Sequence, residues 1–219
     1  MNTLSNRQKS SFTKTQRLTF MAMFTAIIVI LSLTPIGFIP LPFVRATTVH
    51  IPVIIGALIL GPKHGAVLGF VFGLMSLYNN TFNAIPTSFV FSPFYELPGQ
   101  DGGSWLALIV VFVPRILTGV VPWFVFIGLK KILHKNLTPI NWVAAGIAGS
   151  MTNTLLVMHF IYIFFGDAWN SARAEPADVV YTAIIGIVGA NGVPEALVAG
   201  VLVVAIMGAL TVVVSRVKR

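Results

Sequence analysis

The chain is divided into long apolar blocks separated by short polar connections. Four blocks are long enough for a membrane-spanning helix: residues 18–34, 105–129, 140–165 and 181–214. A helix of about 20 apolar residues crosses a hydrocarbon core of roughly 30 Å. The only charged residues inside these blocks are Arg115 and Glu195. The pattern therefore predicts four transmembrane helices, two of which carry one charge in their interior.

A fifth apolar block, residues 49–78, is interrupted at Gly61-Pro62-Lys63-His64-Gly65. Gly and Pro end helices, and a lysine is costly at mid-bilayer. We therefore expect two short helices joined by a turn, which makes six helices in all. The predicted fold class is an all-α membrane protein with a six-helix domain over residues 17–214. Residues 1–16 and 215–219 are expected to be tails, and the polar N-terminal one is not typical of a removable signal peptide.

The composition supports a membrane protein. Of the residues, 56% are hydrophobic and 9% are charged, whereas about 25% are charged in a typical soluble domain. So little polar surface excludes a water-soluble enzyme. The absence of cysteine excludes disulfide frameworks, Cys-ligated zinc and thiol catalysis. His50 and His64 are too isolated in the sequence for a metal site, and no cofactor is predicted.

The basic residues lie almost entirely on one side of the predicted helices. Of the 14 lysines and arginines, Arg115 lies within a span, and only Arg45 and Arg173 fall on the second side. Positive residues gather on the cytoplasmic side of membrane proteins. We therefore expect both termini to be cytoplasmic, and the basic tails to contact anionic lipid and not nucleic acid. The remaining eleven lie on that first side: Arg7, Lys9, Lys14, Arg17, Lys63, Lys130, Lys131, Lys135, Arg216, Lys218 and Arg219.

The two long connections on the opposite side are rich in Pro, Asn and aromatic residues. They cover residues 35–48 and 79–104, and connections of that length usually cover a functional site. We therefore predict a binding site that opens outward. Its candidate substrate-binding residues in and beside these connections are Arg45, Tyr78, Asn79, Asn80 and Phe94.

Arg115 is the polar residue whose insertion into the membrane costs the most free energy. A charged residue at the centre of a membrane helix costs roughly 2.5–3.5 kcal/mol on insertion scales, so it should face the protein interior and have a partner. The partner is either the carboxylate or phosphate of a ligand, or Glu195, and the two possibilities are compatible. Pro114 and Pro122 lie in the same segment and free backbone carbonyls, which kinks a helix or leaves them to accept other bonds.

Glu195 and Asn153 are the other candidate ligand groups inside the spans. Asn191-Gly-Val-Pro-Glu195 is typical of a helix start within an apolar segment, although one long kinked helix explains it equally well. Asn153, within Thr152-Asn-Thr154, needs a partner that is either another helix or a ligand. His159, farther along the same block, is more typical of a core histidine than of a ligand group.

The first predicted helix carries two small side chains one helical turn apart, Ala22 and Ala26. Small residues at this spacing allow another helix to approach closely. Because the other faces of this segment are bulky, we interpret the pair as a notch for a partner helix.

Several motifs resemble one known family. They are Ala22-x-x-x-Ala26, Ala46-Thr-Thr-Val-His-Ile-Pro-Val-Ile-Ile-Gly, Leu60-Gly-Pro-Lys-His-Gly-Ala, Asn79-Asn80-Thr81, Phe91-Ser-Pro-Phe94, Val113-Pro-Arg115, Thr152-Asn-Thr154 and Asn191-Gly-Val-Pro-Glu195. In this order they are similar to the S components of energy-coupling factor (ECF) transporters, and most of all to the pantothenate-specific branch. The resemblance covers residues 17–214, and it implies the ECF S-component fold.

The resemblance also implies a function and partners. An S component binds a water-soluble vitamin at the outer face of the membrane, then docks on a coupling membrane subunit that works with two ATPase subunits, and topples to deliver its cargo. Ala22 and Ala26 would form the docking notch. Residues 35–47 and 79–104 would be gating loops, and polar groups of the last three helices would line the pocket. The chain has no phosphate-binding loop of its own, which agrees with that division of labour.

The residues themselves favour a small anion with amide and hydroxyl groups, and pantothenate is one. An arginine suits its carboxylate, and asparagines suit its amide and hydroxyls. Other cargoes stay open, namely hydroxymethylpyrimidine, pyridoxine and riboflavin, as does a self-contained secondary transporter. An enzyme is disfavoured, because the best pair, Ser150 and His159, lies on opposite sides of one helix.

Overall fold

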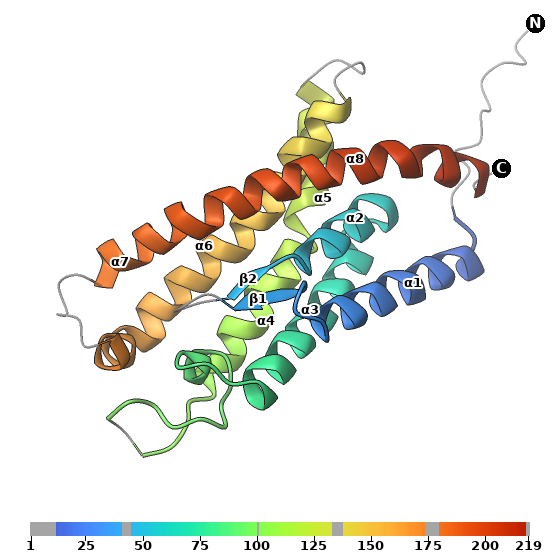
Figure 1. The fold of residues 1–219 in the computed structure, drawn as a ribbon. Coiled ribbons are helices and arrows are strands. Elements are labelled where there is room, and N and C mark those ends of the chain that lie inside the picture. The colour runs from blue at the N-terminus through green and yellow to red at the C-terminus, as the bar shows by residue number, and fades with distance from the viewer. Residues whose placement is uncertain (1–11, 41–44, 100, 133–137, 174–179, 218–219) are drawn as a thin grey trace, which may run out of the picture.

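The computed structural model describes residues 12–40, 45–99, 101–132, 138–173 and 180–217. It is built almost entirely of helices (Figure 1). Four helical segments are long and apolar enough to cross a membrane, namely Lys14–Ser32, Leu106–Ile132, Thr138–Ser171 and Ile185–Thr211. These agree with the four long apolar blocks of the sequence. A shorter apolar helix covers His50–Leu60.

The first three helices are α1 (Lys14–Ser32), α2 (His50–Leu60) and α3 (Pro62–Phe82). The predicted break in the second apolar block is confirmed, because α2 ends and α3 begins around Gly61. Gly61 has a φ of 93°, a conformation that favours glycine. Pro62 follows in the first turn of α3, where its missing N–H has no helical partner to lose.

The segment predicted as one helix over residues 105–129 forms two, α4 (Leu106–Thr118) and α5 (Val121–Ile132). The interruption falls at Gly119, which packs directly against Gly65 of α3. A Cβ atom on either glycine would collide with the backbone carbonyl of the other. The contact of two backbones therefore requires glycine at both positions, and it holds α3 against the junction of α4 and α5.

The last two apolar blocks form α6 (Thr138–Arg173), α7 (Val180–Ile187) and α8 (Val193–Val217). The backbone of α6 departs from helical geometry at Phe165. A π-helical turn, Val188–Gly192, joins α7 to α8, and Val193 has helical φ and ψ of −67° and −50°. Of the two interpretations of Asn191-Gly-Val-Pro-Glu195, the helix start is therefore wrong and the long irregular helix is right.

A short antiparallel hairpin interrupts the helical pattern. Strand β1 (Phe38–Pro40) pairs with β2 (Arg45–Thr47), with Phe38 opposite Thr47. It lies between α1 and α6 in Figure 1, within the connection that the sequence assigned to a loop. The expectation of an all-α fold therefore needs this correction. Three-residue strands are too short to leave a periodic signal in a sequence.

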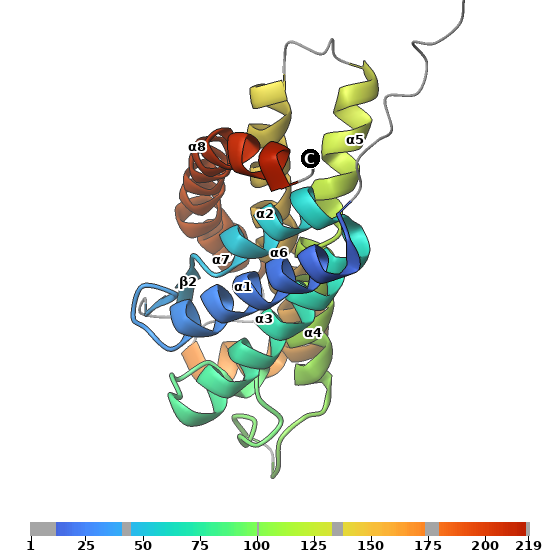
Figure 2. The same cartoon turned by 90° about the vertical axis from the view of Figure 1, so that its right-hand side faces the viewer.

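The ends of the helices are sorted between two sides of the molecule. The start of α1, the α2–α3 turn, the end of α5 and the end of α8 all lie toward the upper right of Figure 1. The start of α4, the end of α6 and the start of α7 lie toward the lower left. Figure 2 shows the same separation, with the connection between α3 and α4 at the bottom.

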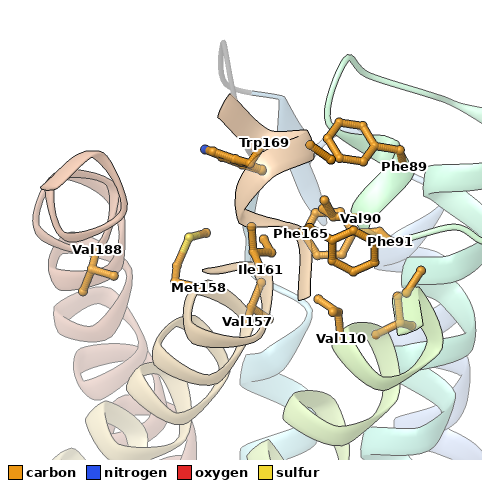
Figure 3. Close-up of a cluster of buried hydrophobic side chains, with 13 residues drawn as sticks. Phe89, Val90, Phe91, Val110, Val157, Met158, Ile161, Phe165, Trp169 and Val188 are labelled. Carbon is orange, nitrogen blue, oxygen red and sulfur yellow. The ribbon is translucent and has the colours of Figure 1, made fainter. Parts of the chain in front are cut away.

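Two clusters of buried apolar side chains stabilise the fold. One joins α1, α2, α3, the hairpin and α8, and includes Ile28, Ile54, Phe72 and Val203. The other joins α4, α6, the π-helical turn and a 3-10 turn, Ser88–Val90. Figure 3 shows this second cluster, in which the side chains of Phe89, Val90 and Phe91 lie against those of α6.

Candidate substrate-binding cavity

A cavity lies between the two apolar clusters and collects residues that are far apart in the sequence. Phe38 of one cluster and Phe91, Val157 and Met158 of the other contribute apolar walls. The full lining is Phe38, Thr47, Ser76, Asn80, Ile85, Phe91, Arg115, Asn153, Thr154, Val157, Met158, Ile187, Asn191, Gly192 and Glu195. An apolar pocket with a few polar groups is typical of a small-molecule site.

Among the described residues that line the cavity, Arg115 is the only basic one, and its side chain is 5% exposed. Its Nη1 donates to the carbonyl oxygen of Val110 at 2.8 Å, and its Nη2 donates to Oγ of Ser76 at 3.3 Å. Its Nε has no hydrogen-bond partner within the described part of the chain. The guanidinium carries five N–H donors, so these bonds leave donor capacity for a ligand.

Two phenyl rings lie close to the guanidinium. Its central carbon is 5.6 Å from the ring centroid of Phe72 and 5.4 Å from that of Phe91. Such cation–π contacts stabilise the charge without neutralising it. Over the described residues, the guanidinium forms no ion pair with a carboxylate, and Glu195 is not bonded to it although both line the cavity. The internal salt bridge considered from the sequence is therefore absent from this structure.

Asn153 and its neighbour Thr154 reach the cavity from α6. The side chain of Asn153 is 6% exposed, and its Oδ1 has no hydrogen-bond partner among the described residues. Asn191 and Glu195 approach from the π-helical turn and α8. The cavity thus has amide and hydroxyl groups in one wall and a carboxylate in another, in addition to the guanidinium.

Asn79 and Asn80 have structural partners. Asn79 donates from Nδ2 to the carbonyl oxygen of Ser32 at 2.7 Å, which ties the end of α3 to the end of α1. Asn80 donates to the carbonyl of Ser76 at 2.9 Å, and its Oδ1 accepts from the hydroxyl of Ser88 at 3.1 Å. Of the two, Asn80 lines the cavity. It therefore connects the cavity wall to the 3-10 turn.

Three of the predicted residues, Tyr78, Asn79 and Phe94, do not line the cavity. Tyr78 is 44% exposed and its ring lies 4.8 Å from that of Phe82, on the outer side of α3. Phe94 is 69% exposed. Arg45 lies in β2, and its side chain is outside the described part of the chain. Tyr78 precedes Asn79, but consecutive residues on a helix face directions about 100° apart.

Several cavity residues were not among the sequence-predicted site residues. Ser76, Thr47 and Asn191 contribute polar groups to the lining. Ser76 lies one helical turn before Asn80, so this spacing places both on one face of α3 and could have identified it. Thr47 reaches the cavity through the hairpin, which has no sequence signal. The carboxyl of Glu195 lies beside the backbone of Thr47, so α8 and the hairpin meet at the cavity.

Ala22 and Ala26 lie outside the cavity, on the exposed side of α1, whereas Phe24 and Ile28 face the interior. The notch is therefore accessible to another helix. His159 is exposed, and its Nδ1 lies 2.7 Å from the carbonyl oxygen of Leu155 in the same helix. It does not line the cavity.

These features define a helical membrane protein with a partly polar internal cavity of the kind that is typical of small-molecule sites. The family model described as the substrate-specific component of ECF transporters matches residues 16–207. The chain belongs to this family, and the predicted resemblance is confirmed. It is therefore a transport protein that passes through the cell membrane several times.

Relatives and a solved structure agree with the family. The pantothenic acid transporter PanT of Lactococcus lactis subsp. cremoris is 39% identical over 203 residues, which cover 90% of this chain and 95% of the relative. The pantothenate transporter PanT of Leuconostoc mesenteroides is 27% identical over 212 residues, covering 93% and 95%. The crystal structure of a biotin S component from an ECF-type ABC transporter matches with a TM-score of 0.54 at 18% identity, covering 90% of this chain and 95% of that one. The last likeness concerns the fold alone.

Proposed function

We propose that this S component binds pantothenate in the cavity around Arg115. One observation carries the proposal, namely a buried guanidinium that lines the cavity and has no carboxylate partner among the described residues. A charge in such a place is costly unless a counter-charge reaches it. The carboxylate of an incoming ligand supplies that counter-charge, and it accepts hydrogen bonds from the remaining guanidinium donors.

The other polar groups of the cavity suit the rest of the molecule. Pantothenate has one carboxylate, one amide and two hydroxyls. Asn153 offers an amide oxygen without a partner in the described chain, which can accept from the ligand amide or a hydroxyl. The carboxylate of Glu195 and the hydroxyl of Thr154 are further partners for hydroxyls. Relatives that are pantothenate transporters, one at 39% identity over most of this chain, add support for the same substrate.

The membrane arrangement follows from the same proposal. The six proposed spans are α1, α2, α3, the pair α4–α5, α6, and α7 together with α8. This even number of spans places both termini on the same side of the membrane, which is the cytoplasm. The basic residues Lys14, Arg17, Lys63 and Lys130 belong to helix ends that share one side of Figure 1. That side is cytoplasmic by the distribution of positive charge. The connection between α3 and α4 then lies outside, near the cavity.

A binding experiment tests the substrate. The purified protein is titrated calorimetrically with pantothenate and with panthenol, in which an alcohol replaces the carboxylate. We expect pantothenate to bind about 100-fold more tightly, because a buried charge pair is worth roughly 2–5 kcal/mol. Equal binding of the two compounds contradicts the role of Arg115. Tight binding of riboflavin, pyridoxine or hydroxymethylpyrimidine in place of pantothenate contradicts the substrate.

We further propose that Ala22 and Ala26 dock on the coupling membrane subunit, which acts with two ATPase subunits. Replacing both by Trp fills the notch without touching the cavity. We expect pantothenate binding to stay unchanged and cellular uptake to be lost. The matched control is Leu197→Trp with Val201→Trp, an exposed pair at the same spacing on α8. Uptake by vesicles that contain this chain alone would contradict the need for a partner.

A further inference from the structure

Pro114 lies inside α4, where a proline is unfavourable unless something compensates. In a regular helix the N–H of residue 114 would donate to the carbonyl of Val110, four residues earlier. Proline has no N–H, so this carbonyl loses its helical partner. In a membrane protein, a backbone carbonyl without a partner is costly, because no water is present to replace the bond.

The guanidinium of Arg115 supplies the missing donor. Its Nη1 lies 2.8 Å from the carbonyl oxygen of Val110, a short distance typical of charge-assisted bonds. The side chain therefore turns back along α4, and its end is anchored on the backbone of the helix that carries it. This anchor exists because residue 114 is a proline.

The anchor restricts how the rest of the guanidinium lies. The hydroxyl oxygen of Ser76, on α3, accepts a hydrogen bond from Nη2 at 3.3 Å. The rings of Phe72 and Phe91 lie within 6 Å of the central carbon of the guanidinium. A planar, forked group that is held in this way loses little freedom when a carboxylate binds. Nε makes no bond to a described residue.

We propose that Pro114 is a positioning residue for the ligand carboxylate, because its missing N–H reserves the Val110 carbonyl for Arg115. The inference rests on the proposed function, in which Arg115 receives that carboxylate. Pro114 does not itself bind the ligand. It sets the orientation of the group that does.

The test is Pro114→Ala in the full-length chain. Alanine restores an N–H that competes with Arg115 for the Val110 carbonyl, so the guanidinium loses its anchor. We expect the Kd for pantothenate to rise about tenfold, in line with one hydrogen bond to a charged group. The melting temperature of the ligand-free protein should not fall, because the variant gains a helical hydrogen bond and a better helix former. Pro114→Leu restores the same N–H and serves if the alanine variant folds poorly.

Pro122→Ala is the matched control. Pro122 is also buried, but it lies in the first turn of α5, where a backbone N–H has no helical partner. Its replacement should leave the Kd for pantothenate unchanged.

A double-mutant cycle separates positioning from a general structural role. Pro114→Ala should cause no additional loss of affinity when Arg115 is already Met, because its effect passes through the arginine. Additive losses would overturn the inference, and so would wild-type affinity in Pro114→Ala. Either result leaves the proposed function intact when Arg115→Met alone weakens binding. Failure of the unmodified protein to bind pantothenate would overturn both.

Discussion

Two regions of this molecule each contain a buried asparagine. In one region the amide oxygen accepts a hydrogen bond, and in the other it has no partner among the described residues. At the end of α3, Asn79 donates to the carbonyl of Ser32, and its Oδ1 accepts from Asn83 at 3.2 Å. In the middle of α6, Oδ1 of Asn153 has no partner in the described chain. Both side chains are more than nine-tenths buried. The difference lies in the hydrogen bonds and not in burial.

This difference indicates what each region contributes. A buried amide whose groups are all bonded stabilises the fold, because leaving any of them without a partner costs about 1–3 kcal/mol. A buried amide oxygen without a hydrogen-bond partner destabilises the protein by that amount. A ligand that donates a hydrogen bond to this oxygen removes the penalty. Arg115 belongs with Asn153, since its Nε also lacks a described partner. The hydrogen bonds of Asn79 assign the region around it to the fold, whereas we propose that the region around Asn153 is the binding region.

Of the substitutions that test this comparison, Arg115→Met should have the largest effect on the affinity for pantothenate. Methionine fills similar space but removes the charge and every donor, so we expect the Kd for pantothenate to rise at least about 100-fold. Calorimetric titration of the purified variant measures it. Arg115→Lys, which keeps the charge but loses the planar fork, should also bind weakly. Unchanged affinity in the lysine variant would refute the role of the guanidinium.

Asn153→Ala should raise the Kd about tenfold and leave thermal stability almost unchanged, because Oδ1 has no bond to lose within the described chain. Titration and thermal unfolding in detergent measure the two quantities. Ser150→Ala is the control, since Ser150 is buried and its Oγ also lacks a described partner, but it does not line the cavity. A similar loss of affinity in both variants would argue against a direct ligand contact.

Asn79→Ala should give the opposite result. Removing the amide breaks the tie between α3 and α1, and we expect the free energy of unfolding to fall by about 1–3 kcal/mol. The Kd for pantothenate should change less than about twofold, because Asn79 does not line the cavity. A large loss of affinity at unchanged stability would reverse our assignment of the two regions.

Among the substitutions that act on the cavity itself, Ser88→Ala should have the smallest effect on pantothenate binding. Its hydroxyl donates to Asn80 and accepts from the N–H of Ile85 at 2.9 Å, so it holds the 3-10 turn against the cavity wall. One neutral hydrogen bond is worth about 1 kcal/mol, so we expect pantothenate to dissociate at most about fivefold faster. Stopped-flow displacement measures the rate. Ser104→Ala, in the same connection, should leave it unchanged.

Much of the fold could be predicted because membrane helices leave long, uniform signals. The apolar blocks marked the long spans, and the glycine and proline at 61 and 62 marked the turn between α2 and α3. The break at Gly119 was not predicted, because it depends on contact with a glycine more than 50 residues away. The hairpin was missed because its strands have three residues each.

The site was predicted in part, for a related reason. Arg115, Asn153 and Glu195 stand out as polar groups inside apolar segments, and all three line the cavity. Asn79 and Tyr78 were grouped with them because they are adjacent in sequence, but which neighbours each side chain meets is decided by the direction it faces on α3. The partner of Asn79 is 47 residues away, on α1. Nothing in the local sequence indicates such a partner.

The π-helical turn between α7 and α8 sets the rotation of α8 about its own axis. Each residue of an α-helix advances about 100° around the axis, so one residue more or less in Val188–Gly192 would rotate the whole of α8 by that angle. Glu195, three residues beyond the turn, would then turn away from the cavity, and the buried side chains of α8 would rotate away from their present neighbours by the same angle. Insertions and deletions should therefore be poorly tolerated in these five residues, of which Val188 and Gly192 are buried.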